Sequence, residues 1–181
     1  PHIREAPLRP PNREHTMAAG DLLIDFPPQS SEPPSTGAAT PDARNGHPVL
    51  DFDASADEAT LFTAVMPWHY AGGGVTVYAV VSFSSDTTAT HAGQLEISFE
   101  RIGDGEQDLD ADGFATAKDL ALTVPATSGL TEVESVAFSH GAEIDNVAAG
   151  EMFRVKVSCD TSDSTFTGDL ELLRLVLRET P

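Results

Sequence analysis

The sequence predicts an all-β fold, an antiparallel jelly-roll or Greek-key β-sandwich of about eight strands with an extended proline-rich N-terminal arm. Short segments of alternating apolar and polar residues recur along residues 48–181, with Gly, Pro, Asp and Ser turns between them. No long segment has helical periodicity, so the crossover helices of a parallel sheet are missing from the pattern. We therefore divide the chain into an arm, residues 1–47, and a sandwich domain, residues 48–181.

The arm differs in composition from the rest of the chain, because nine of the 13 prolines lie in residues 1–47. Such a segment cannot build a core, and in isolation it is expected to be disordered or polyproline-like. Met17 opens MAAGDLLIDF, so translation could start there, or the arm is what remains of a longer product. We expect one apolar patch to anchor the arm on a neighbouring subunit; its residues are Leu22, Leu23, Ile24 and Phe26.

Eight candidate strands follow the Asn45-Gly46 turn signal. The clearest is the segment in which Leu95, Ile97 and Phe99 alternate with polar residues, as in a half-buried strand. The final strand is apolar on both faces, which favours a central place in a sheet. The eight strands are expected at residues 49–52, 61–66, 75–83, 95–100, 120–124, 133–138, 151–159 and 169–177.

The alternation also predicts which side chains point inward. A change of parity between Val133 and Val136 suggests a β-bulge, and residues 141–150 could form one helical turn over an end of the sandwich. Glu96, Glu100, Arg154 and Lys156 are expected to face solvent. The core is expected to contain Val77, Val81, Leu95, Ile97, Phe99, Val155 and Val157.

Composition excludes some classes of partner. With 10 Lys and Arg against 29 Asp and Glu, the net charge is −19, so binding of nucleic acid or membranes through a basic patch is not expected. No apolar run approaches the ~20 residues of a membrane span, and residues 1–11 lack the apolar core of a signal peptide. Cys159 is the only cysteine, and its inward position predicts a small buried hydrophobic side chain.

An acidic segment matches the opening of a calcium loop, with carboxylates at positions 1, 3 and 5 and a glycine at position 6. Position 12 is an aspartate, not the longer glutamate, and a strand precedes the segment where such loops have a helix. The alternative is a solvated acidic connection between strands. The calcium ligands would be Asp108, Asp110, Asp112, the carbonyl of Phe114, and Asp119; no other cofactor is expected.

Trp68 and Tyr70 stand beside the Gly72–Gly74 turn and are candidates for contact with a partner. An exposed pair could stack on a sugar ring, whereas a buried one would close an end of the sandwich or a subunit contact. No G-x-S-x-G, H-E-x-x-H or phosphate-loop motif occurs, so an enzyme is not expected.

Several motifs together resemble jelly-roll virion-associated proteins of tailed bacteriophages, which are mostly uncharacterised. The resemblance covers roughly residues 45–178 and implies a fold and a virion setting, with no catalytic residues. The motifs are NGHPVLDFD at 45–53, Met66-Pro67 with GGVTV at 73–77, Phe99-Glu100-Arg101 with DLDAD at 108–112, and AGE at 149–151 with FRVKV at 153–157.

These features lead to a first hypothesis, a capsid decoration or cement subunit in the virion. It would be a homo-oligomer, with a trimer as one option, and it would contact other copies of itself and virion proteins such as the major capsid protein. The alternative is a calcium-assisted glycan- or receptor-binding module on a phage tail or fibre, using Trp68 and Tyr70. A hydrolase with an unrecognised carboxylate site is the third hypothesis.

Overall fold

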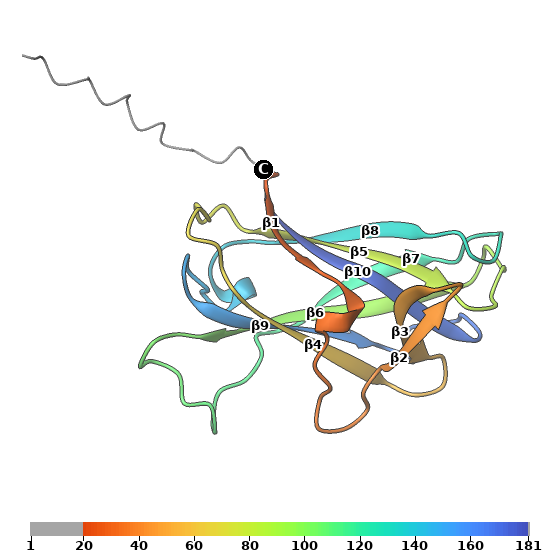
Figure 1. Ribbon diagram of the computed structural model, residues 1–181, viewed down its shortest axis with the longest axis horizontal. Helices are drawn as coiled ribbons and strands as arrows, with labels where there is room; N and C mark the ends of the chain where they lie inside the picture. Colours follow the sequence, from red (N-terminus) through yellow and green to blue (C-terminus); the bar gives the residue numbers. More distant parts are fainter. Residues whose placement is uncertain (1–19, 181) are drawn as a thin grey trace, which may run out of the picture.

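The computed structural model describes residues 20–180 and consists of two antiparallel β-sheets packed face to face (Figure 1). The jelly-roll β-sandwich predicted from the sequence is therefore confirmed. The strands are β1 (Leu22–Phe26), β2 (Thr40–Arg44), β3 (His47–Asp53), β4 (Glu58–Val65), β5 (Val75–Phe83), β6 (Ala92–Ile102), β7 (Lys118–Thr123), β8 (Glu132–Phe138), β9 (Met152–Cys159) and β10 (Asp169–Glu179); the 3₁₀ helices are η1 (Pro28–Ser30) and η2 (Ala142–Ile144).

The six-stranded sheet is built around β10. Its order is β2-β3-β10-β5-β8, and β1 pairs with the second half of β10. Strand β10 pairs with β5 along its whole length and with β3 along its first half, which confirms its central position. A register shift between Leu172 and Arg174 marks a bulge where β3 gives way to β1.

The four-stranded sheet has the order β4-β9-β6-β7, and β9 pairs with both β4 and β6. All seven side chains expected in the core are buried. At the centre, the Phe99 ring lies 5.0 Å from Phe138 and 6.0 Å from Phe153 between ring centroids. The buried side chains form one hydrophobic core between the sheets, and every strand except β2, which is largely exposed, contributes side chains to it.

Two details of strand orientation differ from the prediction. Strand β8 runs without a register shift, and Val133 faces outward opposite Val80, so no bulge explains the change of parity. Glu100 is on the outer face but only 3% exposed, because Arg154 pairs with it and residues 103–117 fold back over it. Ala115 N donates to the Phe99 carbonyl at 2.8 Å, which fixes that segment against β6.

Part of the predicted arm belongs to the sandwich. Strand β1 pairs with β10, its Leu23 and Phe26 side chains are buried in the core, and the Phe26 ring stacks on Phe62 at 5.1 Å. This corrects the expectation that the Leu22–Phe26 patch anchors an arm on another subunit, because the edge of β10 beyond β3 is filled by this chain. The boundary at residue 47 falls where β3 begins, and residues 1–19 lie outside the described residues.

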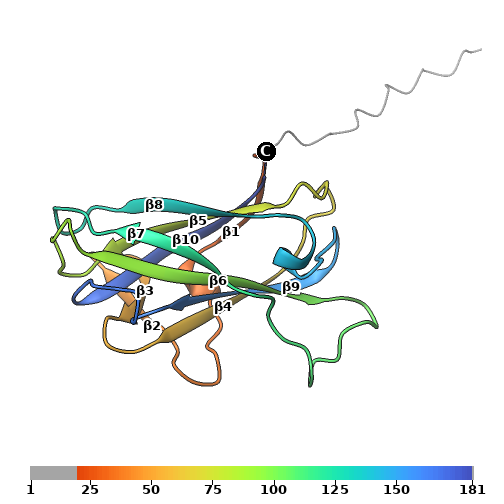
Figure 2. The ribbon, with the colours of Figure 1, turned by 180° about the vertical axis from the view of Figure 1, so that it is seen from behind.

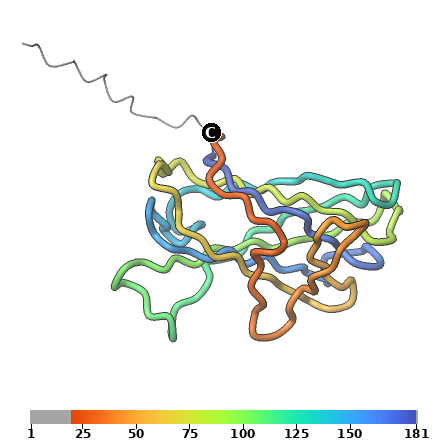
Figure 3. Tube along the Cα trace, in the orientation of Figure 1, coloured from red at the N-terminus to blue at the C-terminus, as the bar shows by residue number. Residues whose placement is uncertain are grey.

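The connections lie at two ends of the sandwich. Residues 66–74, 103–117 and 139–151 project from one end, and residues 84–91, 124–131 and 160–168 from the other (Figures 1 and 2). The tube in Figure 3 shows residues 103–117 reaching furthest from the first end. Helix η2 forms the helical turn expected within residues 141–150. Among residues 20–180, no helix has the length and apolar character required to cross a membrane.

Candidate functional site

Trp68 is the most exposed large hydrophobic side chain of the described residues, at 84%. Its six-membered ring lies over Gly150, where a Cβ atom would stand 2.4 Å from the ring atoms Cη2 and Cζ3. Gly150 also has φ +83°, a conformation that favours glycine. The backbone at Gly150 therefore contacts the six-membered ring of an indole that is otherwise open to solvent.

The loop that carries Trp68 forms backbone hydrogen bonds with Gly150 and Glu151, the segment that the indole contacts. Met66 N donates to the Glu151 carbonyl and Gly150 N to the Met66 carbonyl, each at 2.8 Å. Tyr70 N donates to the Pro67 carbonyl at 3.0 Å, which closes a tight turn around Trp68. The indole is thus presented by a hydrogen-bonded segment, and little backbone ordering remains for a ligand to impose.

Tyr70 has the opposite environment from Trp68. It is buried, its hydroxyl accepts a hydrogen bond from Gly74 N at 3.2 Å, and it lies 3.1 Å from His140 Nδ1. Burial raises the pKa of the phenol above its ordinary value. The two interpretations of this aromatic pair therefore apply to different residues. Tyr70 is buried and closes an end of the sandwich, whereas Trp68 is exposed.

The C-terminal strand holds the other side of the loop. Glu179 Oε1 accepts hydrogen bonds from Ala71 N and Gly73 N, both at 3.0 Å. The Glu179 side chain is buried, and its Oε2 atom has no partner among the described residues. A carboxylate from β10 thus fixes the loop between Trp68 and β5.

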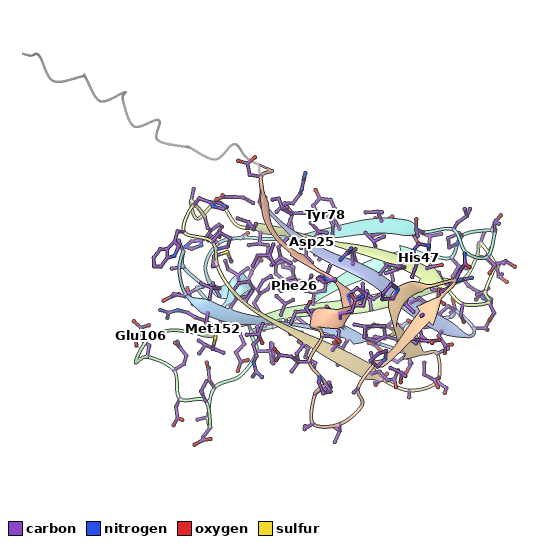
Figure 4. All side chains as sticks on the ribbon, viewed as in Figure 1. Asp25, Phe26, His47, Tyr78, Glu106 and Met152 are labelled. Atoms are coloured by element: carbon purple, nitrogen blue, oxygen red, sulfur yellow. The ribbon has the colours of Figure 1, made fainter. Side chains whose placement is uncertain are left out.

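A cavity of about 470 Å³ is linked to the indole through Gly150, which lines the cavity and contacts the Trp68 ring; Trp68 itself is not a lining residue. Its floor is a cross-strand row of apolar residues, because Met152 pairs with Val65 on one side and Ile102 on the other. Loop residues of the 103–117 segment complete it, and Figure 4 labels Met152 and Glu106 at this end of the molecule. We call this cavity together with Trp68 the indole cleft; its remaining lining residues are Gly103, Asp104, Gly105, Gln107, Leu109, Gly150 and Glu151.

The polar groups of the indole cleft form hydrogen bonds and ion pairs with each other and with the adjacent Arg101. Gln107 Oε1 accepts a hydrogen bond from Gly103 N at 2.7 Å. Arg101 donates through both Nε and Nη2 to Glu151 and also pairs with Glu106 at 2.7 Å. The guanidinium hydrogen bonds lower the pKa of Glu151 below its ordinary value, and the two carboxylates raise that of Arg101. The cleft combines an apolar floor with amide and carboxylate groups at its rim.

The predicted calcium ligands do not converge. Among residues 20–180, no group of three or more His, Cys, Asp or Glu side chains is arranged to hold a metal ion. Asp119 lies within β7 opposite Glu96, and the Phe114 ring lies under Arg154, 5.3 Å from the guanidinium carbon. Asp110 N and Asp112 N both bond to Asp108, so the segment forms a turn in which the three aspartates remain exposed. The calcium loop stays a prediction without a formed site.

Two other cavities have different linings. One, of about 450 Å³, lies at the opposite end of the outer face of the four-stranded sheet and is mainly polar, with Lys156, Glu96 and Asp160 in its wall. The other, of about 390 Å³, lies beside Arg44, whose guanidinium is occupied by Glu171 and by the Phe83 carbonyl. Neither lining contains a Phe, Tyr or Trp side chain, whereas the indole cleft includes Trp68 by its contact with Gly150.

Sequence reasoning identified Trp68 but missed the residues that complete the cleft. Gly150 could have been identified only as a turn residue, since a glycine before a strand often marks a turn with positive φ. Val65 and Met152 were placed in or beside strands, and only the cross-strand register brings them together. Gln107 gave no signal, because a loop glutamine has no periodicity from which its orientation follows.

No protein-family model and no curated protein matches the chain. Solved structures do resemble it in fold. The CBM22-2 xylan-binding domain of Paenibacillus barcinonensis Xyn10C is 10% identical with a TM-score of 0.52, and 87% of this chain covers 99% of that domain. The xylan-binding module CBM15 is 11% identical with a TM-score of 0.50, covering 90% and 100%. The Agl-KA catalytic domain has a TM-score of 0.54 at 11% identity, over 90% of this chain and 29% of that one.

These comparisons correct the first functional hypothesis. Two of these structures, which match 90% and 87% of this chain over almost their own full length, are xylan-binding modules, so the prediction of a capsid decoration or cement subunit is wrong. That prediction combined the resemblance in strand and turn motifs with the acidic composition, the missing catalytic motif and the proline-rich arm. The predictions of a homo-oligomer and of a virion location stay predictions.

Proposed function

We propose that this protein is a non-catalytic carbohydrate-binding module that binds a polysaccharide chain in the indole cleft. The observation that carries the proposal is Trp68, an 84% exposed indole held on a hydrogen-bonded loop beside a cavity. The fold is similar to that of modules named for xylan binding, which supports a ligand of this class. The glycan-binding alternative from the sequence is retained, without calcium in its mechanism.

The chemistry of a sugar ring suits this arrangement. One face of a pyranose presents C–H groups that stack on the negative face of an indole, while its hydroxyls need polar partners at the edges. The apolar floor at Val65 and Met152 extends the stacking surface, and Gln107 and Asp104 stand at the rim. A volume of about 470 Å³ lies in the range of ordinary ligand sites.

Binding without catalysis also agrees with how the cleft carboxylates are used. Glycoside hydrolysis requires one carboxyl group to act as an acid and another as a base or nucleophile. Glu151 and Glu106 both pair with Arg101, and Glu151 also accepts a hydrogen bond from Ala148 N at 2.8 Å. A low pKa at Glu151 opposes a role as general acid.

The test uses Trp68 as its own reporter, because it is the only tryptophan in the chain. Oligosaccharides of xylan, mannan and β-glucan are titrated into the protein while the indole emission is recorded. A glycan that stacks on Trp68 should quench or blue-shift the emission in a saturable way. If none of these oligosaccharides changes the emission, and none binds by calorimetry, the proposal fails.

Substitution of the indole gives a second measurement. Trp68→Ala should weaken the best glycan about tenfold or more, which corresponds to about 1.4 kcal/mol, measured by calorimetry or affinity electrophoresis. The control is Leu130→Ala, which removes another exposed apolar side chain from the opposite end of the sandwich. Equal affinities of the two variants would place glycan binding elsewhere.

A further inference from the structure

The charges around the indole cleft are strongly one-sided. Of the described residues that line the cavity, Asp104 and Glu151 are charged and none is basic. Glu106 adds a third carboxylate through its contact with Arg101. Counted together, Asp104, Glu106 and Glu151 outnumber the one guanidinium, Arg101, which pairs with two of them, so the cleft has an excess of negative charge.

Arg101 is not available to a ligand as a free cation. Its side chain is mostly buried, and its Nε and Nη2 groups donate to Glu151 while Nη2 also meets Glu106. Because Arg101 keeps the pKa of Glu151 low, the pair remains ionised in mildly acidic solution. An incoming carboxylate or sulfate would meet no unpaired positive group in this cavity.

The segment 103–117, part of which lines the cavity, carries further negative charge. Residues 103–117 contain Asp104, Glu106, Asp108, Asp110 and Asp112 and no lysine, arginine or histidine. The last three share one turn, because Asp108 accepts hydrogen bonds from the backbone of the other two. Carboxylates within a Debye length, about 8–10 Å in physiological salt, act together on a charged ligand.

Trp68, like the carboxylates, attracts cations. The face of an indole attracts cations more strongly than that of any other aromatic side chain. This contribution comes from the same exposed side chain that a neutral sugar would use for stacking. A sugar that carries a protonated amine would gain from the indole and from the carboxylates at once.

We infer that the indole cleft selects glycans with protonated amino groups, such as β-linked polymers of non-acetylated amino sugars, over neutral and anionic glycans. The inference rests on the proposed function and names its ligand class. Exposed ion pairs contribute modestly, so the carboxylates of the cleft together should give a preference of about fivefold or more over the neutral counterpart. Uronate-bearing and sulfated glycans should bind more weakly than neutral ones.

A net charge of −19 would draw a polycation to any part of this surface, so the test must report on the cleft alone. Emission from Trp68 does this, since binding elsewhere leaves the indole in water. A glucosamine oligomer, its N-acetylated counterpart and a uronate oligomer of the same length are titrated in mildly acidic buffer. The glucosamine oligomer should bind about fivefold or more tighter than the N-acetylated one, and the advantage should shrink as salt rises from about 0.02 M to about 0.5 M.

Two variants that change net charge equally locate the effect. Asp104→Asn removes a carboxylate from the cleft, and Asp163→Asn removes an exposed one from residues 160–168 at the opposite end. The preference for the glucosamine oligomer should fall in Asp104→Asn and persist in Asp163→Asn. Equal or tighter binding of the N-acetylated oligomer, or equal effects of the two variants, overturns the charge inference but leaves the proposed function standing. If no oligomer alters the emission or binds by calorimetry, both are overturned.

Discussion

Two aromatic residues only two positions apart have different roles in this protein. Tyr70 is enclosed by Gly74 and His140, whereas Trp68 lies on the backbone of Gly150 and is open to solvent. Both occur in one irregular loop, so no period in the sequence assigns them to opposite environments. The difference follows from hydrogen-bond partners that come from distant parts of the chain.

Gly150→Ala is expected to displace the indole. The new methyl group would overlap the Trp68 ring, and the positive φ adds about 1–2 kcal/mol of backbone strain. We expect a lower melting temperature, altered Trp68 emission without ligand, and weaker glycan binding. Gly141→Ala is the matched control, because Gly141 has φ +112° but no heavy atom within 4 Å of the added Cβ. It should lose stability with unchanged emission and affinity, and identical behaviour of the two variants would argue against the indole contact.

At the scale of elements, the loop with Trp68 depends on the last strand of the chain. Strand β10 is central in its sheet, and its Glu179 carboxylate accepts the backbone N–H groups of Ala71 and Gly73. This connects a rigid strand to a short surface loop. The geometry of the indole is therefore set partly by a residue that need not touch the ligand.

Replacement of Glu179 tests whether its hydrogen bonds to the loop support both stability and glycan binding. Glu179→Ala leaves two backbone donors without an acceptor, at a cost of about 1–3 kcal/mol each, so both melting temperature and glycan affinity should fall. Glu179→Gln keeps one oxygen as acceptor and should retain most of both. Equal losses in the two variants, measured by thermal melts and calorimetry, would show that the carboxylate does not act through these bonds.

Sequence periodicity predicted the strands well and the loops poorly. The alternation in β6 and β9 correctly buries Leu95, Phe99 and Val155. Glu100 follows the same alternation yet is buried, because residues 103–117 return over it and no local pattern encodes that return. Of the candidate site, Trp68 was identified from its residue type, while its support at Gly150 depends on a contact across 82 positions of sequence, 150 − 68.

Over the whole molecule, one carboxyl group opposes folding at neutral pH. Asp51 has a pKa raised to about 6, first by burial and then by Asp42, Asp169 and Glu171. Its Oδ1 atom has no hydrogen-bond partner among the described residues. Charging this group therefore costs more in the folded chain than in the unfolded one.

The sign of the resulting pH dependence follows from linkage. The folded pKa of about 6 exceeds the ordinary value of 3.8, so folding takes up a proton between them. The stability that Asp51 contributes is complete below about pH 4 and is lost as pH rises through about 6. Asp51→Asn should raise the melting temperature at pH 7 more than at pH 4 in thermal melts across this range. An equal rise in the melting temperature of Asp51→Asn at both pH values would contradict a raised pKa of Asp51.

The pairing of β1 with β10 also determines when this chain can finish folding. Leu22 pairs with Arg178, so the contact joins the first described strand to the last and cannot form until synthesis has passed residue 178. Until then the Phe26 side chain has no partner strand, and the edge of the sheet beside β10 does not exist. Closure of so long a loop makes folding slow compared with that of proteins built from local contacts. During synthesis, the segment that later completes the sandwich is therefore an exposed apolar strand in need of protection from aggregation.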